Sequence, residues 1–204
     1  MQPMTSISEL ESHYGAPSTA SLVKETDRLV PVYRRLIEAS PFVGLATVGP
    51  DGLDCSPRGD RSGELLRIVD DHTLMMPDRR GNNRIDSLRN IVTDPRVALL
   101  FLIPGSGTAL RVNGRAIVTA DADLCRSFAV EDKPPRSVIV ITIEKVYFQC
   151  ARAIIRSELW NPDHYGRAAT LPSAGEILAA LSHGQTGGAD YDSQWTERAK
   201  SSLW

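Results

Sequence analysis

The sequence has few cysteines, no excess of positive charge and no long hydrophobic run. Its 204 residues include three cysteines, and 23 Lys and Arg stand against 25 Asp and Glu. A formal net charge of -2 provides no global attraction for nucleic acid or an acidic membrane, so any anion must be bound locally. No stretch approaches the ~18 consecutive apolar residues of a membrane span. We expect neither nucleic acid nor a membrane as partner.

Motifs for metals, disulfides and covalent catalysis are also missing. Cys55, Cys125 and Cys150 are widely spaced, without a C-x-x-C pair or neighbouring histidines, so we expect no metal site and reduced thiols that pack in a cytosolic protein. The first ~20 residues carry acids instead of a basic segment followed by an apolar run, which argues against a signal peptide. None of the four histidines stands beside a serine or cysteine pattern. We therefore predict a cytoplasmic protein without a covalent nucleophile.

Hydrophobic spacing divides the chain into three parts that form one unit. Residues 1–40 are predicted to be an N-terminal helical cap, because Ile7, Leu10 and Tyr14 are helically spaced and Pro31 is typical of a helix start. Residues 41–160 form the central domain. Residues 161–204 are predicted to be a C-terminal helical extension. In that extension Ser173 and Glu176 form a capping-box pattern, residues 184–188 form a flexible connection, and a last helix covers 191–204.

The central domain shows the alternation of short strands. A buried strand is predicted at 42–48, and Gly49-Pro50-Asp51-Gly52 forms a turn into a second strand at 53–56. Further strands are expected at 65–69, 73–76, 97–103, 110–118 and 138–148. Short helices are expected at 83–91, with Ile85, Leu88 and Val92 on one face, and at 122–130. This order predicts a mainly β fold with α decoration, a closed or partly closed barrel.

Two segments of this domain are dense in arginine and small polar residues. They are Ser56-Pro57-Arg58-Gly59-Asp60 and Pro77-Asp78-Arg79-Arg80-Gly81-Asn82-Asn83-Arg84. In the second segment a strand leads into a glycine-containing loop that opens a helix, so backbone N–H groups and Arg84 can converge on one anion. Arg58 can add a bidentate contact, which suits a phosphate monoester. The alternative is that these arginines are solvated surface charges.

These segments belong to an ordered set of motifs that resembles a bacterial subgroup of the pyridoxamine phosphate oxidase-like, FMN-dependent proteins. The other members of the set are Ser40-Pro41-Phe42, Asp86-Ser87-Leu88-Arg89-Asn90, Leu110-Arg111-Val112-Asn113-Gly114-Arg115-Ala116, Lys133-Pro134-Pro135-Arg136-Ser137 and Ile155-Arg156-Ser157-Glu158-Leu159-Trp160. The resemblance runs from about residue 9 to the C-terminus. It implies a split β-barrel of Greek-key type that forms a homodimer with FMN at the subunit interface.

The resemblance also assigns candidate cofactor contacts. It places Arg79, Asn82, Asn83 and Arg84 beside the FMN phosphate, and Ser56 and Arg58 on the neighbouring strand. Arg111 and Trp160 become candidates at the flavin ring edge or from the partner subunit. For Arg111 and Arg115 the alternative is a structural role beside a bulge at Asn113-Gly114, and for Trp160 it is an aromatic anchor at the end of the barrel.

The functional hypothesis that follows is an FMN-dependent oxidoreductase acting on an unidentified small molecule. Flavin carries out the electron or hydride transfer, so the protein needs no triad and no metal. The Lys133 to Arg136 loop is the one further basic cluster that could serve a substrate anion. Two alternatives stay open: a non-enzymatic flavin-binding protein for storage or redox sensing, and the same barrel binding a deazaflavin or haem. We also expect Trp195 and Trp204 to dock across the partner subunit.

Overall fold

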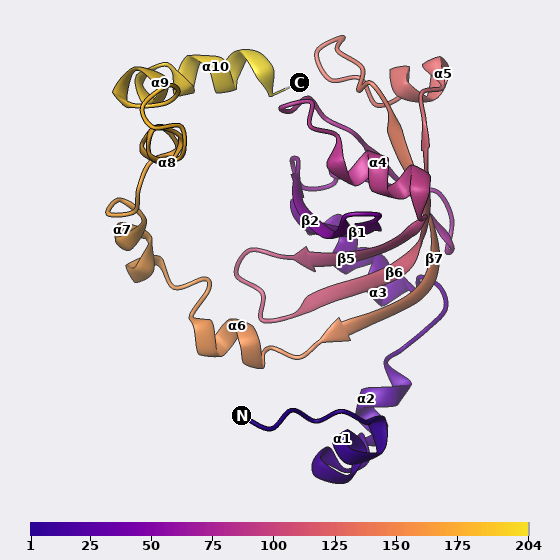
Figure 1. Cartoon of the computed structure of the whole chain (residues 1–204). Helices are drawn as coiled ribbons and strands as arrows, with labels where there is room; N and C mark the ends of the chain where they lie inside the picture. Colours follow the sequence, from indigo (N-terminus) through magenta and orange to yellow (C-terminus); the bar gives the residue numbers. More distant parts are fainter. Residues whose placement is uncertain (204) are drawn as a thin grey trace.

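The computed structural model describes residues 1–203, in which one seven-stranded antiparallel sheet carries the core (Figure 1). The strand order is β2-β1-β5-β6-β7-β4-β3, and every neighbouring pair runs antiparallel. The strands are β1 Phe42–Gly49, β2 Gly52–Gly59, β3 Arg67–Ile68, β4 Thr73–Pro77, β5 Arg96–Leu102, β6 Ala109–Thr119 and β7 Val138–Gln149. The predicted mainly β fold is confirmed, although β3 is shorter than the predicted 65–69.

Helices decorate the sheet at its ends and connections. They are α1 Ile7–Tyr14, α2 Thr19–Val23, α3 Pro31–Glu38, α4 Asp86–Thr93, α5 Ala122–Arg126, α6 Arg152–Ser157, the 3-10 helix η1 Pro162–His164, α7 Tyr165–Ala168, α8 Ala174–Leu181, α9 Ala189–Ser193 and α10 Trp195–Ser202. Of these, α4 packs against β1. No helix within residues 1–203 is both long and apolar enough to pass through a bilayer.

Alternation along the strands builds the core. On β1, Val43 and Leu45 are fully buried, whereas Phe42, Gly44 and Ala46 face outward. The same period puts the inward residues of β5, β6 and β7 into one continuous apolar cluster. Each fully buried aliphatic side chain contributes about 1.5–3 kcal/mol to the stability of the fold. The core therefore keeps the ends of the strands rigid, and polar side chains project from these ends.

A β-bulge interrupts the pairing of β6 with β7. The register shifts between Asn113 and Gly114, where a Cβ on Gly114 would collide with the backbone of Thr142 and Ile143. Only glycine tolerates such a close approach of two strands. The bulge that Asn113-Gly114 suggested is confirmed, and it bends the two longest strands of the sheet.

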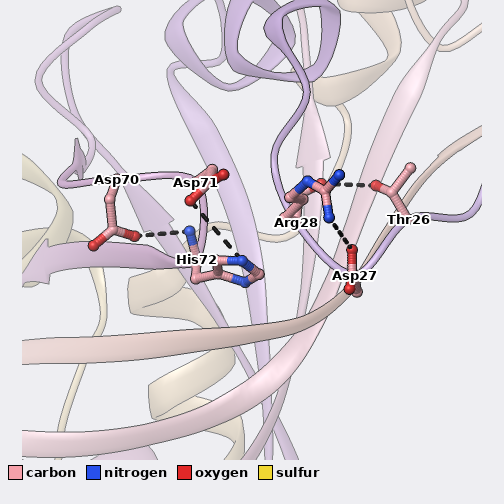
Figure 2. A network of polar contacts seen from close by, with 6 residues as sticks. All are labelled: Thr26, Asp27, Arg28, Asp70, Asp71 and His72. Carbon is pink, nitrogen blue, oxygen red and sulfur yellow. Dashed lines mark hydrogen bonds and ion pairs between the residues drawn. The ribbon is translucent and has the colours of Figure 1, made fainter.

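Residues 26–28 and 70–72 form two short segments, each with polar contacts of its own (Figure 2), and hydrogen bonds of Thr26 and Leu29 tie the entry of the chain to the barrel. Thr26 exchanges both backbone hydrogen bonds with Val146, at 2.9 and 2.7 Å, and its hydroxyl donates to the Arg28 carbonyl. The Leu29 N–H donates to the Asp71 carbonyl at 2.7 Å. This tie directs the buried face of α3 into the core.

The helices before this tie differ from the predicted cap. Pro31 begins α3 as predicted, with Tyr33 and Ile37 buried. However, α1 and α2 bury no residue, and Ile7 and Tyr14 are 71% and 77% exposed. The spacing of their apolar residues predicts a helix, but it does not determine whether another part of the chain covers the apolar face.

The helix predicted at 83–91 starts later and turns a different face inward. It begins at Asp86 because Asn83 and Ile85 take left-handed φ angles of 60° and 53°, which cannot continue an α-helix. Ser87 and Ile91 are its buried residues, whereas Ile85 and Val92 are exposed. The expectation that Ile85 and Val92 share the inward face with Leu88 was wrong.

The C-terminal extension is helical, with more pieces than predicted. The capping box of Ser173 and Glu176 is confirmed, since each side chain accepts from the other residue's backbone N–H. The segment 184–188 is held rather than free, because the Gly188 N–H donates to the Gly175 carbonyl at 2.8 Å. The single helix predicted over 191–204 is two helices, α9 and α10, while Trp204 lies outside the described residues.

Candidate functional site

A cleft of about 940 Å³ lies where the ends of β2 and β4 meet two loops. One wall is the loop of residues 78–86 before α4, and the other is the loop of residues 132–136 before β7. Six of the eight predicted contact residues line it: Ser56, Arg58, Arg79, Asn82, Asn83 and Arg84. The volume falls within the range of cofactor and small-molecule sites. The structure thus brings together residues up to 28 positions apart that the sequence grouped by motif alone.

The loop before α4 has an unusual backbone. Asn83 and Ile85 both adopt left-handed φ, and for a β-branched residue such as isoleucine this is a strained conformation. The Asn82 side chain accepts from the Arg84 backbone N–H at 3.1 Å and closes the turn. Non-glycine residues hold such conformations where the surrounding structure enforces them, and these positions concentrate at ligand sites.

Two ion pairs line the cleft. Arg58 Nη1 lies 2.6 Å from Asp78 Oδ1, and Arg79 Nε lies 2.8 Å from Asp60 Oδ2. The Asp60 side chain is only 1% exposed, so Arg79 neutralises a buried carboxylate. Arg79 also donates to the Phe128 carbonyl at 2.7 Å. Arg79 is therefore fixed as a clamp between the loop and the residues after α5.

Arg58 is held differently, because part of its donor capacity is unused. Its Nε is buried and has no hydrogen-bond partner among residues 1–203. A buried guanidinium N–H without an acceptor costs on the order of 1–3 kcal/mol. An acceptor entering the cleft beside Arg58 would remove that cost, which makes Arg58 the strongest indication of an anionic or oxygen-rich ligand.

The upper walls carry further cations. Arg84 pairs with Asp86 at 2.8 Å on the exposed rim, and Arg136 Nη1 donates to Asn83 Oδ1 at 3.2 Å across the cleft. Arg136 is presented by a hairpin in which Val130 and Lys133 exchange both backbone hydrogen bonds. The two residues between them, Glu131 and Asp132, have φ of 50° and 60°, as a tight two-residue turn requires. The hairpin gives the cleft the basic cluster noted at 133–136.

Two predicted residues lie elsewhere. Arg111 is on β6, with its guanidinium 5.1 Å from the centre of the Tyr147 ring. Trp160 donates its indole N–H to the Ser106 carbonyl at 2.7 Å. Neither lines the cleft of its own chain. Their assignment to a flavin bound by the partner subunit stays a prediction.

The sequence did not reveal the carboxylates that hold the arginines in place. Asp60 and Asp78 stand inside the quoted motifs, but only the folded structure shows that each faces an arginine of the other segment. Alternating charges in both segments were the available signal. No group of three or more His, Cys, Asp or Glu in the described chain has the arrangement of a metal site.

Comparison with known proteins gives one clear sequence match. A family model described as pyridoxamine 5′-phosphate oxidase matches residues 29–150, more than half of the chain and the whole of the cleft. No curated protein sequence matches the chain. The match confirms the family resemblance and the split-barrel fold that it implies.

Solved structures are similar to somewhat more than half of the chain. A Lactobacillus delbrueckii protein described as a pyridoxamine 5′-phosphate oxidase is 27% identical, over 60% of this chain and 95% of its own, with a TM-score of 0.49. HupZ of Group A Streptococcus is 18% identical, over 58% and 91%, with a TM-score of 0.48. General stress protein 26 of Bacillus anthracis is 19% identical, over 56% and 88%, with a TM-score of 0.42.

Proposed function

The chain belongs to the pyridoxamine 5′-phosphate oxidase family of flavin-binding split-barrel proteins, and from this premise we propose that it binds FMN in the cleft before α4. We propose further that it acts as a homodimer and as an oxidoreductase on a small molecule. The observation that carries the proposal is the set of arginine and asparagine donors around one cleft, with the Arg58 Nε left without an acceptor.

The residues of the cleft fit the chemistry of FMN. Its phosphate is a dianion that needs several donors, and Asn82, Asn83 and Arg84 lie on the loop that leads into α4. Ser56 and Arg58, on the adjoining strand β2, supply donors to the ribityl chain or the ring. Arg79 has an indirect role, because it holds Asp60 and the residues after α5 in place.

When bound, FMN supplies the hydride or electron transfer itself. The chain would contribute binding and orientation of the ring. Lys133 and Arg136 face the cleft from the opposite hairpin and favour a substrate that carries negative charge. The substrate class that this charge supports is a small organic anion.

The outer face of the sheet supports the homodimer. Phe42, Gly44 and Ala46 of β1 lie beside Leu100 and Ala98 of β5 on that face, and Phe42 and Leu100 are 40% and 43% exposed. Small and apolar residues on a flat sheet face suit a self-complementary interface, in which one patch meets its copy. Arg111 lies on the same face next to Leu100 and is thus placed to reach a neighbouring subunit.

An absorption spectrum of the purified protein, followed by mass analysis of the released ligand, tests the proposal. We expect the flavin spectrum and the mass of FMN, or stoichiometric binding when FMN is added to the apoprotein. A deazaflavin or haem spectrum would keep the barrel and replace the ligand. A protein that neither contains nor binds FMN would contradict the proposal.

Turnover separates the oxidoreductase from the storage alternative. Reduced FMN in the protein is mixed with oxygen, quinones and small nitro or aldehyde acceptors, and its reoxidation is followed in the flavin band. Reoxidation faster than that of free reduced FMN by any acceptor supports an enzyme. Equal rates with all of them favour a flavin carrier.

A further inference from the structure

The segment after α6 lies apart from the barrel that precedes it. Residues 162–203, here called the C-terminal arm, lead away from the barrel and curve round it at a distance (Figure 1). Within the arm, α7 packs on η1, α8 on α9 and α9 on α10, whereas contacts with the described strands are sparse. The last firm tie to the barrel is the hydrogen bond from Trp160 to Ser106, just before the arm begins.

The arm has a defined internal structure. Asp192 of α9 accepts from the Gly175 N–H at 2.8 Å and from the Ser173 hydroxyl at 2.5 Å, so that α9 is fixed to the first turn of α8. A side chain at Gly175 would collide with Asp192 and with the Gly188 carbonyl. Gly175 and Asp192 thus fix α9 on α8. Such contacts indicate an ordered segment and not a flexible tail.

The shape that the arm keeps exposes its apolar side chains. Six large ones are between 48% and 78% exposed: Tyr165, Leu171, Ile177, Leu181, Trp195 and Leu203. Helices of five to eight residues are not stable alone in water and depend on packing of their apolar face. Within residues 1–203 these faces are only partly covered, which leaves them open to packing against another molecule.

The total surface area indicates how much surface is left uncovered. The chain exposes 13519 Å², whereas a compact monomer of 22.3 kDa exposes about 9,400 Å². The excess is about 4,000 Å² per chain. Obligate homodimers bury on the order of 2,000–5,000 Å² or more in total. The area that a mutual exchange of arms would bury lies at or beyond the top of this range. The N-terminal helices α1 and α2, which bury no residue, share in this excess, and its size is that of an intertwined dimer and too large for a small ligand or a peptide.

We propose that the C-terminal arm of each chain packs on a second copy of this chain, so that two arms are exchanged across a two-fold axis. Reciprocal exchange covers both arms at once and closes the assembly, as an isologous contact does. The proposal extends the homodimer of the proposed function but does not depend on flavin. The arm would therefore hold the pair together even when the cofactor is absent.

The test compares the dissociation constant of the dimer in three proteins by sedimentation and light scattering. In Ile177→Asp/Leu181→Asp, two carboxylates stand on the apolar face of α8. In the control, Ser62→Asp, one carboxylate stands at an exposed polar position between β2 and β3, outside the arm and outside the cleft. We expect the apo full-length chain to be a dimer, the double variant to dissociate at least about tenfold more readily, and the control to be unchanged. A dimer too tight to dissociate is compared by the rate of subunit exchange.

Hydrogen exchange keeps the proposal testable if the double variant misfolds. In the unmodified chain, we expect amide protection of α8 and α10 to fall on dilution below the dissociation constant, while protection of β1 and β7 persists. Each of three results would overturn the proposal: a monomeric full-length chain, equal dimer affinity in all three proteins, or arm protection that does not depend on concentration. Flavin binding is not a readout, so failure here leaves the cofactor proposal untouched.

Discussion

Arg84 is the residue at which the cofactor proposal can be tested with least disturbance of the fold. Its side chain is 73% exposed and pairs only at the rim, with Asp86. Replacing Arg84 with Ala removes a charge-assisted donor from the cleft while leaving the buried Arg79–Asp60 pair intact. We expect FMN affinity to fall by about tenfold or more, measured by fluorescence titration of the apoprotein.

Arg28→Ala is the matched control for this measurement. Arg28 is an exposed arginine, paired with Asp27 on the turn shown in Figure 2, and does not line the cleft. Its loss removes the same charge from the molecule at a site outside the cleft. If both variants bind FMN as the unmodified chain does, the phosphate lies elsewhere; if both lose affinity equally, the effect is one of net charge.

Asp94 gives a residue-scale prediction of pH dependence. The hydrogen bonds that Arg96 donates, from its guanidinium and its backbone N–H, lower the pKa of Asp94 to about 2. Because this value lies below the roughly 3.9 of an unfolded aspartate, the carboxylate stabilises the fold above pH ~4, and this contribution is lost as the pH falls toward 2. We expect Asp94→Asn to lower the unfolding midpoint at neutral pH, with a deficit that shrinks between pH ~4 and ~2.

Denaturant unfolding across this pH range measures the effect, with Asp51→Asn as the control. Asp51 lies in the exposed turn between β1 and β2, and the structure gives it no ion pair within residues 1–203. A deficit for Asp94→Asn that stayed constant down to pH 2 would show that its charge is not the cause.

Among individual residues, the sequence predicted membership of the site better than the role of each member. Ser56, Arg58, Asn82 and Arg84 line one cleft as their motifs indicated. The fixed role of Arg79 could not be predicted, because its partner Asp60 belongs to another strand end and only the folded sheet sets their 2.8 Å contact. Pairings between segments are tertiary information that a local motif does not contain.

At the scale of elements, the bulge between β6 and β7 supports a stability prediction. A Cβ at Gly114 would collide with the Thr142 carbonyl, which belongs to the backbone and cannot rotate away. We expect Gly114→Ala to lower the free energy of unfolding by about 2–3 kcal/mol, because the two strands must separate or bend. Gly81→Ala is the control, since a Cβ there meets nothing within 4 Å. Equal stability of the two variants in urea would contradict this view of the bulge.

Elements were predictable where alternation or a capping motif marked them. Strands β1, β5 and β7 follow their apolar alternation, and Ser173 with Glu176 marks the start of α8. The start of α4 was not predictable, because residue preference disfavours the left-handed φ that Ile85 adopts. The residue at which sequence preference and structure disagree lines the cleft, which is where backbone strain at a ligand site is expected.

At the scale of the whole molecule, the chain ends in helices whose apolar faces are turned outward. The sequence predicted helices at both ends and a partner subunit, yet periodicity cannot tell whether an apolar face meets its own barrel or another chain. The exposed faces of α1, α8 and α10 show that both ends of the chain turn away from the core. In the proposed dimer, the barrel keeps its own core, whereas the extensions at its ends pack on a second molecule.

A dependence of heat stability on concentration tests this view without any variant. When a dimer unfolds to two free chains, a tenfold higher protein concentration adds about 1.4 kcal/mol per dimer to the unfolding free energy. With an unfolding entropy of about 2.1 cal/mol/K per residue, this raises Tm by about 2 °C for two chains of 204 residues. Calorimetry of the apoprotein over a hundredfold range of protein concentration should therefore show a rise in Tm of about 4 °C.

A midpoint independent of concentration would mean either that the folded chain is monomeric or that the arms separate before the barrel melts. Light scattering below the midpoint distinguishes the two. Only the second outcome is compatible with exchanged arms, because a barrel with its own core can outlast the contact that its extensions make.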